Sequence, residues 1–69
     1  MRKLTIIPNE RYFGNHNGYG VCLYYNDGTW YETDEYDEDV QDYINFEPVY
    51  LTDYELRKIF ESEIEIYEN

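Results

Sequence analysis

The sequence predicts an α+β domain with a small antiparallel β-sheet of three to four strands, one main helix and one short helix. Two runs rich in aromatic and β-branched residues flank an Asn-Asp-Gly turn at residues 26–28, a pattern typical of a β-hairpin. A helix-start motif occupies residues 52–55, and a shorter stretch with helical spacing precedes it at residues 40–45. The same chain therefore carries signals for a sheet and for helices.

Length and composition favour one folded domain, residues 1–69. A chain of 69 residues is close to the lower limit for independent folding. Its residues are 42% hydrophobic and 20% aromatic, with ten Tyr, which supplies enough apolar material for a small core and distinguishes it from acidic disordered segments. Self-association as a homodimer, or a bound partner, is a source of added stability for so small a core.

The N-terminal third is expected to hold one strand and one loop. Its β-branched residues predict a strand at residues 3–7, closed by Pro8, which cannot donate to a ladder. Three glycines lie in residues 14–20. Glycine-rich loops also bind phosphate, but that use needs a helix start and usually a lysine, and neither is nearby. We expect a flexible loop between strands.

The hairpin at residues 21–33 forms the centre of the expected sheet, and two registers fit it. A two-residue Asp-Gly turn pairs Leu23 with Glu32, whereas a three-residue loop pairs Leu23 with Tyr31. We predict the three-residue loop, with Gly28 in the left-handed conformation of a bulge. The choice matters because a shift of one residue moves every side chain of the strand to the opposite face of the sheet. The predicted outer face then carries Cys22, Tyr24, Trp30 and Glu32.

A short helix is expected after the acidic region. Val40, Tyr43 and Ile44 have the i, i+3, i+4 spacing of a helix face, and Asp39 precedes them as a good N-cap. These features predict a helix over residues 40–45.

The clearest helix start lies further along the chain. Thr52 and Glu55 have the spacing of a capping box, and Leu51 and Leu56 that of a hydrophobic staple. We expect this main helix to pack on one face of the sheet. Apolar and charged residues alternate at residues 63–67, so this segment is either a continuation of the helix or a last edge strand, and we favour the strand.

The acidic run at residues 32–42 dominates the electrostatics. Seven of its eleven residues are carboxylates, and no Lys or Arg lies between Arg11 and Arg57. The net charge of −11 costs stability through self-repulsion, which a basic partner would offset. The run carries one charge per about 2.4 Å if helical and per about 5 Å if extended. Duplex DNA carries one per about 1.7 Å, or about 3.4 Å per strand, so a partly helical run approaches nucleic-acid charge density.

Nucleic-acid mimicry is the function that these charges favour. The sign of the charge argues against direct binding to DNA or RNA and for a basic nucleic-acid-binding protein as partner. Tyr36 and Tyr43 alternate with the acids and are candidate apolar anchors. The predicted partner-binding residues are Asp34, Glu35, Asp37, Glu38, Asp39 and Asp42 in place of phosphates, with Tyr24, Trp30 and Tyr36 as anchors.

One other function fits the sequence. The acidic run is alternatively a solvated face that keeps the protein soluble. In that case the protein is a regulatory interaction module, which binds a host enzyme or polymerase through the aromatic face of the hairpin.

Catalysis, metal binding and cofactors are not expected. The chain has one His, one Cys and one Ser, too few for a convincing catalytic set or a zinc site. No frame of the acidic run places Gly and Glu where a helix-loop-helix calcium loop requires them. The lone Cys22 excludes an internal disulfide. With no apolar run of membrane-spanning length and no signal-peptide pattern, we expect a soluble, cytoplasmic protein that is repelled by anionic lipid.

The overall profile resembles a known class of inhibitors. The chain is very small, strongly acidic and rich in Tyr, and it contains no Ala. In these respects it is similar to phage-encoded DNA-mimic inhibitors, such as anti-CRISPR, anti-restriction and uracil-DNA glycosylase inhibitor proteins. The resemblance implies a stoichiometric inhibitor that occupies the DNA- or PAM-binding groove of a host nuclease, Cas effector or repair enzyme.

Overall fold

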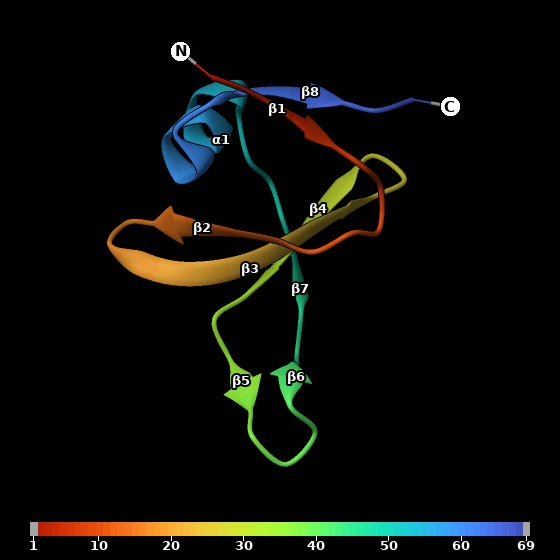
Figure 1. The fold of residues 1–69 in the computed structure, drawn as a ribbon, viewed down its shortest axis with the longest axis vertical. Helices are drawn as coiled ribbons and strands as arrows, with labels where there is room; N and C mark the ends of the chain where they lie inside the picture. Colours follow the sequence, from red (N-terminus) through yellow and green to blue (C-terminus); the bar gives the residue numbers. More distant parts are fainter. Residues whose placement is uncertain (1, 69) are drawn as a thin grey trace.

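The computed structural model describes residues 2–68 and is built mostly of β-strands (Figure 1). One helix of eight residues accompanies them. The predicted α+β arrangement with two helices is therefore wrong, because most of the chain between the first strand and the helix forms hairpins. The elements are β1 (Lys3–Ile6), β2 (Tyr12–His16), β3 (Tyr19–Asn26), β4 (Thr29–Thr33), β5 (Tyr36–Asp37), β6 (Asp42–Tyr43), β7 (Glu47–Val49), α1 (Asp53–Phe60) and β8 (Glu63–Ile66).

The strands form three sheets. An antiparallel sheet with the order β2-β3-β4-β7 lies at the centre, and β1 pairs in parallel with β8 in a second sheet. The third is the two-stranded ribbon β5-β6. In Figure 1, α1 and the β1-β8 pair lie at one end of the long axis and the β5-β6 ribbon at the other, with the central sheet between them.

The core lies between the central sheet and the layer formed by α1, β1 and β8. Trp30 of β4 and Phe60 of α1 are both buried, with their ring centroids 6.0 Å apart. Gly14 of β2 allows α1 to approach closely, because a Cβ at this position would lie 2.5 Å from Ile59 Cγ2. The face of the sheet that meets α1 is called the helix face below, and the opposite face is called the second face.

The capping box at the start of α1 is confirmed. The Thr52 hydroxyl accepts a hydrogen bond from the Glu55 amide, and the Thr52 amide donates to Glu55 Oε1 at 3.1 Å. The expected staple residues Leu51 and Leu56 are both buried in the core. The helix packs on one face of the sheet, as predicted, and it ends at Glu61, which has the left-handed conformation.

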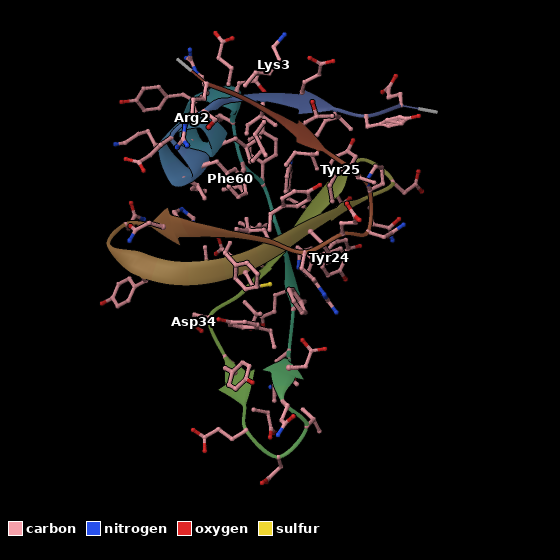
Figure 2. All side chains as sticks on the ribbon, in the orientation of Figure 1. Arg2, Lys3, Tyr24, Tyr25, Asp34 and Phe60 are labelled. Carbon is pink, nitrogen blue, oxygen red and sulfur yellow. The ribbon has the colours of Figure 1, made fainter. Side chains whose placement is uncertain are left out.

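The central hairpin has the two-residue turn, so the predicted three-residue loop is wrong. Asp27 and Gly28 have φ values of 47° and 83°, as a type I′ turn requires. Leu23 therefore pairs with Glu32, and Tyr25 pairs with Trp30. Every β4 side chain is shifted by one position relative to β3, and Trp30 moves from the predicted outer face to the helix face. Figure 2 shows the alternation on β3, with Tyr25 on the side of Phe60 and Tyr24 on the side of the ribbon.

The glycine-rich segment is a second hairpin rather than a loop. Asn17 and Gly18 have φ values of 54° and 89°, and His16 pairs with Tyr19 across them. The turn therefore resembles the Asp-Gly turn of the central hairpin.

The predicted short helix at residues 40–45 is also wrong. This segment contains a turn and β6, with Gln41 and Asn45 in the left-handed conformation. The C-terminal segment is a strand, as favoured, but β8 pairs with β1 and does not extend the central sheet. No helix within residues 2–68 is long and apolar enough to cross a membrane.

Candidate partner-binding surface

The acidic run projects from the central sheet as a hairpin, which we call the acidic arm (residues 34–45). Its strands β5 and β6 pair Tyr36 with Tyr43 and Asp37 with Asp42. In Figure 1 the arm forms the end of the molecule furthest from α1. The principal extents of the chain are 36 × 30 × 19 Å, and the arm lies at one end of the longest axis.

Hydrogen bonds from side chains hold the tip of the arm. Asp37 Oδ1 accepts from the amides of Asp39 (2.7 Å) and Val40 (3.3 Å). Short polar side chains that bond to nearby amides in this way favour turns over helices. The left-handed residue Gln41 then returns the chain to β6.

A second set of hydrogen bonds fixes the base of the arm to the sheet. The buried Thr33 hydroxyl donates to the Ile44 carbonyl at 2.6 Å and accepts from the Glu35 amide at 3.1 Å. The Ile44 amide donates to the Glu35 carbonyl at 3.0 Å, and Asn45 Nδ2 donates to Glu35 Oε2 at 3.1 Å. Thr33 of β4 therefore bonds to both sides of the arm's base, and the other two bonds close that base within the arm.

All six predicted phosphate substitutes lie on this arm. Asp37 is half-buried and the other five are exposed. Across residues 2–68 the only ion pair of a Lys or Arg is Lys3–Glu65 at 3.3 Å, and the only His–carboxylate contact is His16–Glu32 at 2.6 Å, so the arm carboxylates have no cationic partner within the described chain. Figure 2 places Arg2 and Lys3 at the end of the molecule away from the arm. The six carboxylates are Asp34, Glu35, Asp37, Glu38, Asp39 and Asp42.

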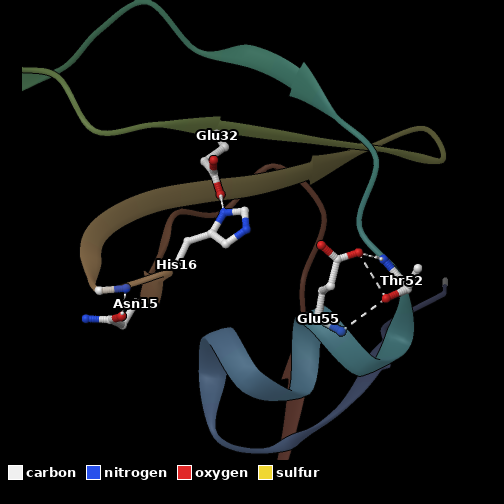
Figure 3. A network of polar contacts seen from close by, with 6 residues as sticks. Asn15, His16, Glu32, Thr52 and Glu55 are labelled. Atoms are coloured by element: carbon white, nitrogen blue, oxygen red, sulfur yellow. Dashed lines mark hydrogen bonds and ion pairs between the residues drawn. The ribbon is translucent and has the colours of Figure 1, made fainter.

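Like charges also face each other across paired strands. Asp37 lies opposite Asp42 in the ribbon, and Glu32 lies opposite Glu47 in the central sheet. Directly opposed like charges destabilise a sheet. In the second pair, Glu32 is hydrogen-bonded to His16 (Figure 3), whereas no histidine within residues 2–68 contacts the first pair.

The aromatic anchors predicted from sequence have separate locations. Trp30 is 6% exposed and belongs to the core, so it is not an anchor. Tyr24 is half-buried on the second face, stacked on Tyr31 with the ring centroids 4.8 Å apart. Tyr36 lies on the arm and is 51% exposed. Of the three predicted anchors, Tyr36 has the most accessible ring.

Sequence reasoning missed Phe13 as a surface residue. It is 65% exposed, and its ring contacts that of Tyr43 at a centroid distance of 5.6 Å. Tyr43 in turn contacts Tyr36 at 5.1 Å. The Asn-Gly dipeptide at residues 17–18 is the signal that would have revealed this arrangement, because a hairpin there makes β2 a strand and places Phe13 opposite Cys22.

A cleft of about 760 Å³ lies beside the base of the arm, where His16 meets Glu32. It is open and mostly polar, with Asp34, Glu35 and Glu47 among its lining residues. Within residues 2–68, no group of three His, Cys, Asp or Glu side chains is arranged to hold a metal ion. The cleft extends the acidic surface of the arm onto the edge of the helix face.

Cys22 is separate from this surface. It is fully buried on the second face, and burial raises the pKa of its thiol, with Arg11 lowering and Asp42 raising it to smaller extents. A raised pKa reduces the thiolate fraction at neutral pH, and the thiolate is the nucleophile. Cys22 is therefore a packing residue.

Comparisons with protein-family models, with curated proteins and with solved structures found no match. Function is therefore inferred from the residues and the geometry of this surface.

Proposed function

We propose that the protein is a stoichiometric inhibitor of a basic nucleic-acid-binding protein, and that the acidic arm occupies the partner's nucleic-acid groove in place of phosphates. The observation that carries this proposal is the set of six arm carboxylates without a cationic partner within residues 2–68. A nuclease, Cas effector or repair enzyme has the basic groove that such an arm complements. Phage or mobile-element counter-defence in the host cytoplasm is the corresponding biological setting.

The construction of the arm supports a binding role over a role in solubility alone. A net charge of magnitude about 2–8 is sufficient to keep a small domain soluble, and this chain has −11. Here the acids are also concentrated on one hydrogen-bonded projection, where the Asp37–Asp42 pairing opposes like charges. Such an arrangement costs folding free energy that a cationic groove would recover on binding.

The alternative, an interaction module that binds through the aromatic face of the hairpin, loses its largest anchor. Trp30 packs against Phe60 in the core and is not available to a partner. The aromatic residues that are exposed near the arm therefore supplement the charges and do not form a separate site.

Capture followed by competition tests the proposed function. The protein is immobilised, bacterial lysate is passed over it, and bound proteins are eluted either with rising salt or with an excess of DNA or RNA. We expect to capture a basic nucleic-acid-binding protein that is eluted by excess nucleic acid. Its activity should fall to zero at one equivalent of inhibitor. A captured protein that keeps its nucleic acid and its activity while bound would contradict the proposal.

A further inference from the structure

Aromatic residues of the second face and of the acidic arm form two groups, which together we call the aromatic band. One group joins the arm to β2, and the other lies where β3, β4 and the segment before β7 meet. The aromatic band consists of Phe13, Tyr36 and Tyr43 in the first group and Tyr24, Tyr31 and Phe46 in the second.

The second group already holds an arginine from the chain itself. The Arg11 guanidinium carbon lies 4.4 Å from the centroid of Phe46 and 5.1 Å from that of Tyr24. Both distances are within the range of cation–π contacts. Within the described residues Arg11 is in no ion pair, so the rings, and not a carboxylate, are its direct contacts.

The first group has the same kinds of ring without a cation over them. No Lys or Arg within residues 2–68 contacts Phe13, Tyr36 or Tyr43 in this way. Phe13 and Tyr36 are 65% and 51% exposed. Asp37 and Asp42 are the sequence neighbours of Tyr36 and Tyr43 on the arm. Exposed rings and carboxylates therefore lie together where the arm meets β2.

We propose that the Phe13–Tyr36–Tyr43 group of the aromatic band binds arginine side chains of the basic partner, with the arm carboxylates attracting the same guanidinium groups. This inference deepens the proposed function and rests on it. Arginine is the expected cation because its planar guanidinium stacks on rings and pairs with carboxylates, and it is more weakly hydrated than the lysine ammonium. The charge of the arm complements either cation, whereas the rings distinguish between them.

Two synthetic peptides of equal length and charge test this preference directly. One alternates arginine with glycine and the other alternates lysine with glycine, and each is titrated against the intact protein. We expect the arginine peptide to bind more tightly, with a preference per ring contact of up to about two- to fivefold, the full value of an exposed cation–π contact. The shifted aromatic resonances in an NMR titration should be those of Phe13, Tyr36 and Tyr43.

Leucine variants distinguish the contribution of the aromatic π face from that of apolar surface area. The double variant Phe13→Leu, Tyr36→Leu keeps apolar side chains but removes two of the three π faces, so it should lose most of the preference for the arginine peptide. The matched control Tyr50→Leu, Tyr67→Leu changes two exposed tyrosines that lie outside the arm and should keep the preference. Circular dichroism establishes that both variants are folded before titration.

The possible failures are distinguishable. If both peptides bind with equal affinity to the wild-type protein, charge alone is responsible, and the arginine inference is overturned while the proposed function stands. If neither peptide binds at low salt, the acidic arm does not receive cations, and the proposed function fails with it. Discrimination as large in the Phe13→Leu, Tyr36→Leu variant as in the wild-type protein would also overturn the assignment to these rings.

Discussion

The burial of Cys22 depends on the register of the central hairpin. In the predicted register it lay on an outer face, whereas in the structure it is fully buried. Both turns fit the Asn-Asp-Gly sequence, because glycine adopts positive φ in either one. The difference is that Asp27 also has a positive φ, of 47°, which Asp tolerates better than most residues. The turn could be predicted from the sequence, but its length could not.

Replacing Cys22 with serine tests that burial. The variant places a hydroxyl where the thiol is 0% exposed, and a buried hydroxyl without a partner costs about 1–3 kcal/mol. Urea denaturation should show a loss of that size. The wild-type thiol should also react slowly with a thiol reagent at neutral pH and quickly in urea, because burial raises its pKa. A variant as stable as the wild type would contradict this position of Cys22.

At the scale of elements, local signals identified α1 and missed the arm. The capping box specifies its own geometry through two reciprocal hydrogen bonds, so the four residues 52–55 are sufficient to predict where α1 begins. The arm has a helix-like spacing of Val40, Tyr43 and Ile44, yet Asp37 holds the start of this segment in a turn, and the left-handed conformation of Gln41 is incompatible with a helix. The attachment of Thr33 to Ile44 is an interaction across eleven positions, which no local pattern contains. The six carboxylates of the candidate site were predicted, but the hairpin that displays them was not.

The capping box makes helix stability depend on pH. Hydrogen bonds from the Thr52 amide and hydroxyl lower the pKa of Glu55. Because the folded-state pKa is depressed, this contribution is present above the ordinary glutamate pKa of about 4.3 and is lost as pH falls below it. Melting curves should show that Glu55→Gln flattens the fall in Tm between about pH 5 and about pH 3. Parallel curves for the variant and the wild type would mean that ionised Glu55 does not support the cap.

For the whole molecule, the dominant feature is a large negative charge on a small body. The longest extent is 36 Å, comparable with a Debye length of about 30 Å at 0.01 M salt and far greater than about 8 Å at 0.15 M. Low salt therefore leaves nearly all the acids repelling one another, and moderate salt restricts the repulsion to neighbours.

Stability should accordingly increase with salt. We expect a higher Tm at 0.15 M than at 0.01 M sodium chloride, measured by thermal denaturation. The variant Asp37→Asn, Glu38→Gln, Asp39→Asn should depend less on salt, because it removes three of the eleven net charges. Asn at position 37 keeps an oxygen that can accept the two amide bonds at the tip. A wild-type Tm that is unaffected by salt would contradict this account of self-repulsion.

The affinity of that same neutralised variant for the captured partner tests the central claim most directly. Its control is Glu61→Gln, Glu63→Gln, Glu68→Gln, which removes the same number of charges from α1's C-terminal end and the β8 region, away from the arm. Mimicry by the arm predicts that the arm variant binds about tenfold more weakly at 0.15 M salt, as three exposed ion pairs of about 0.5 kcal/mol each would give. The control should bind like the wild type. Equal affinity of the two variants for the partner would contradict a phosphate-like role of the acidic arm.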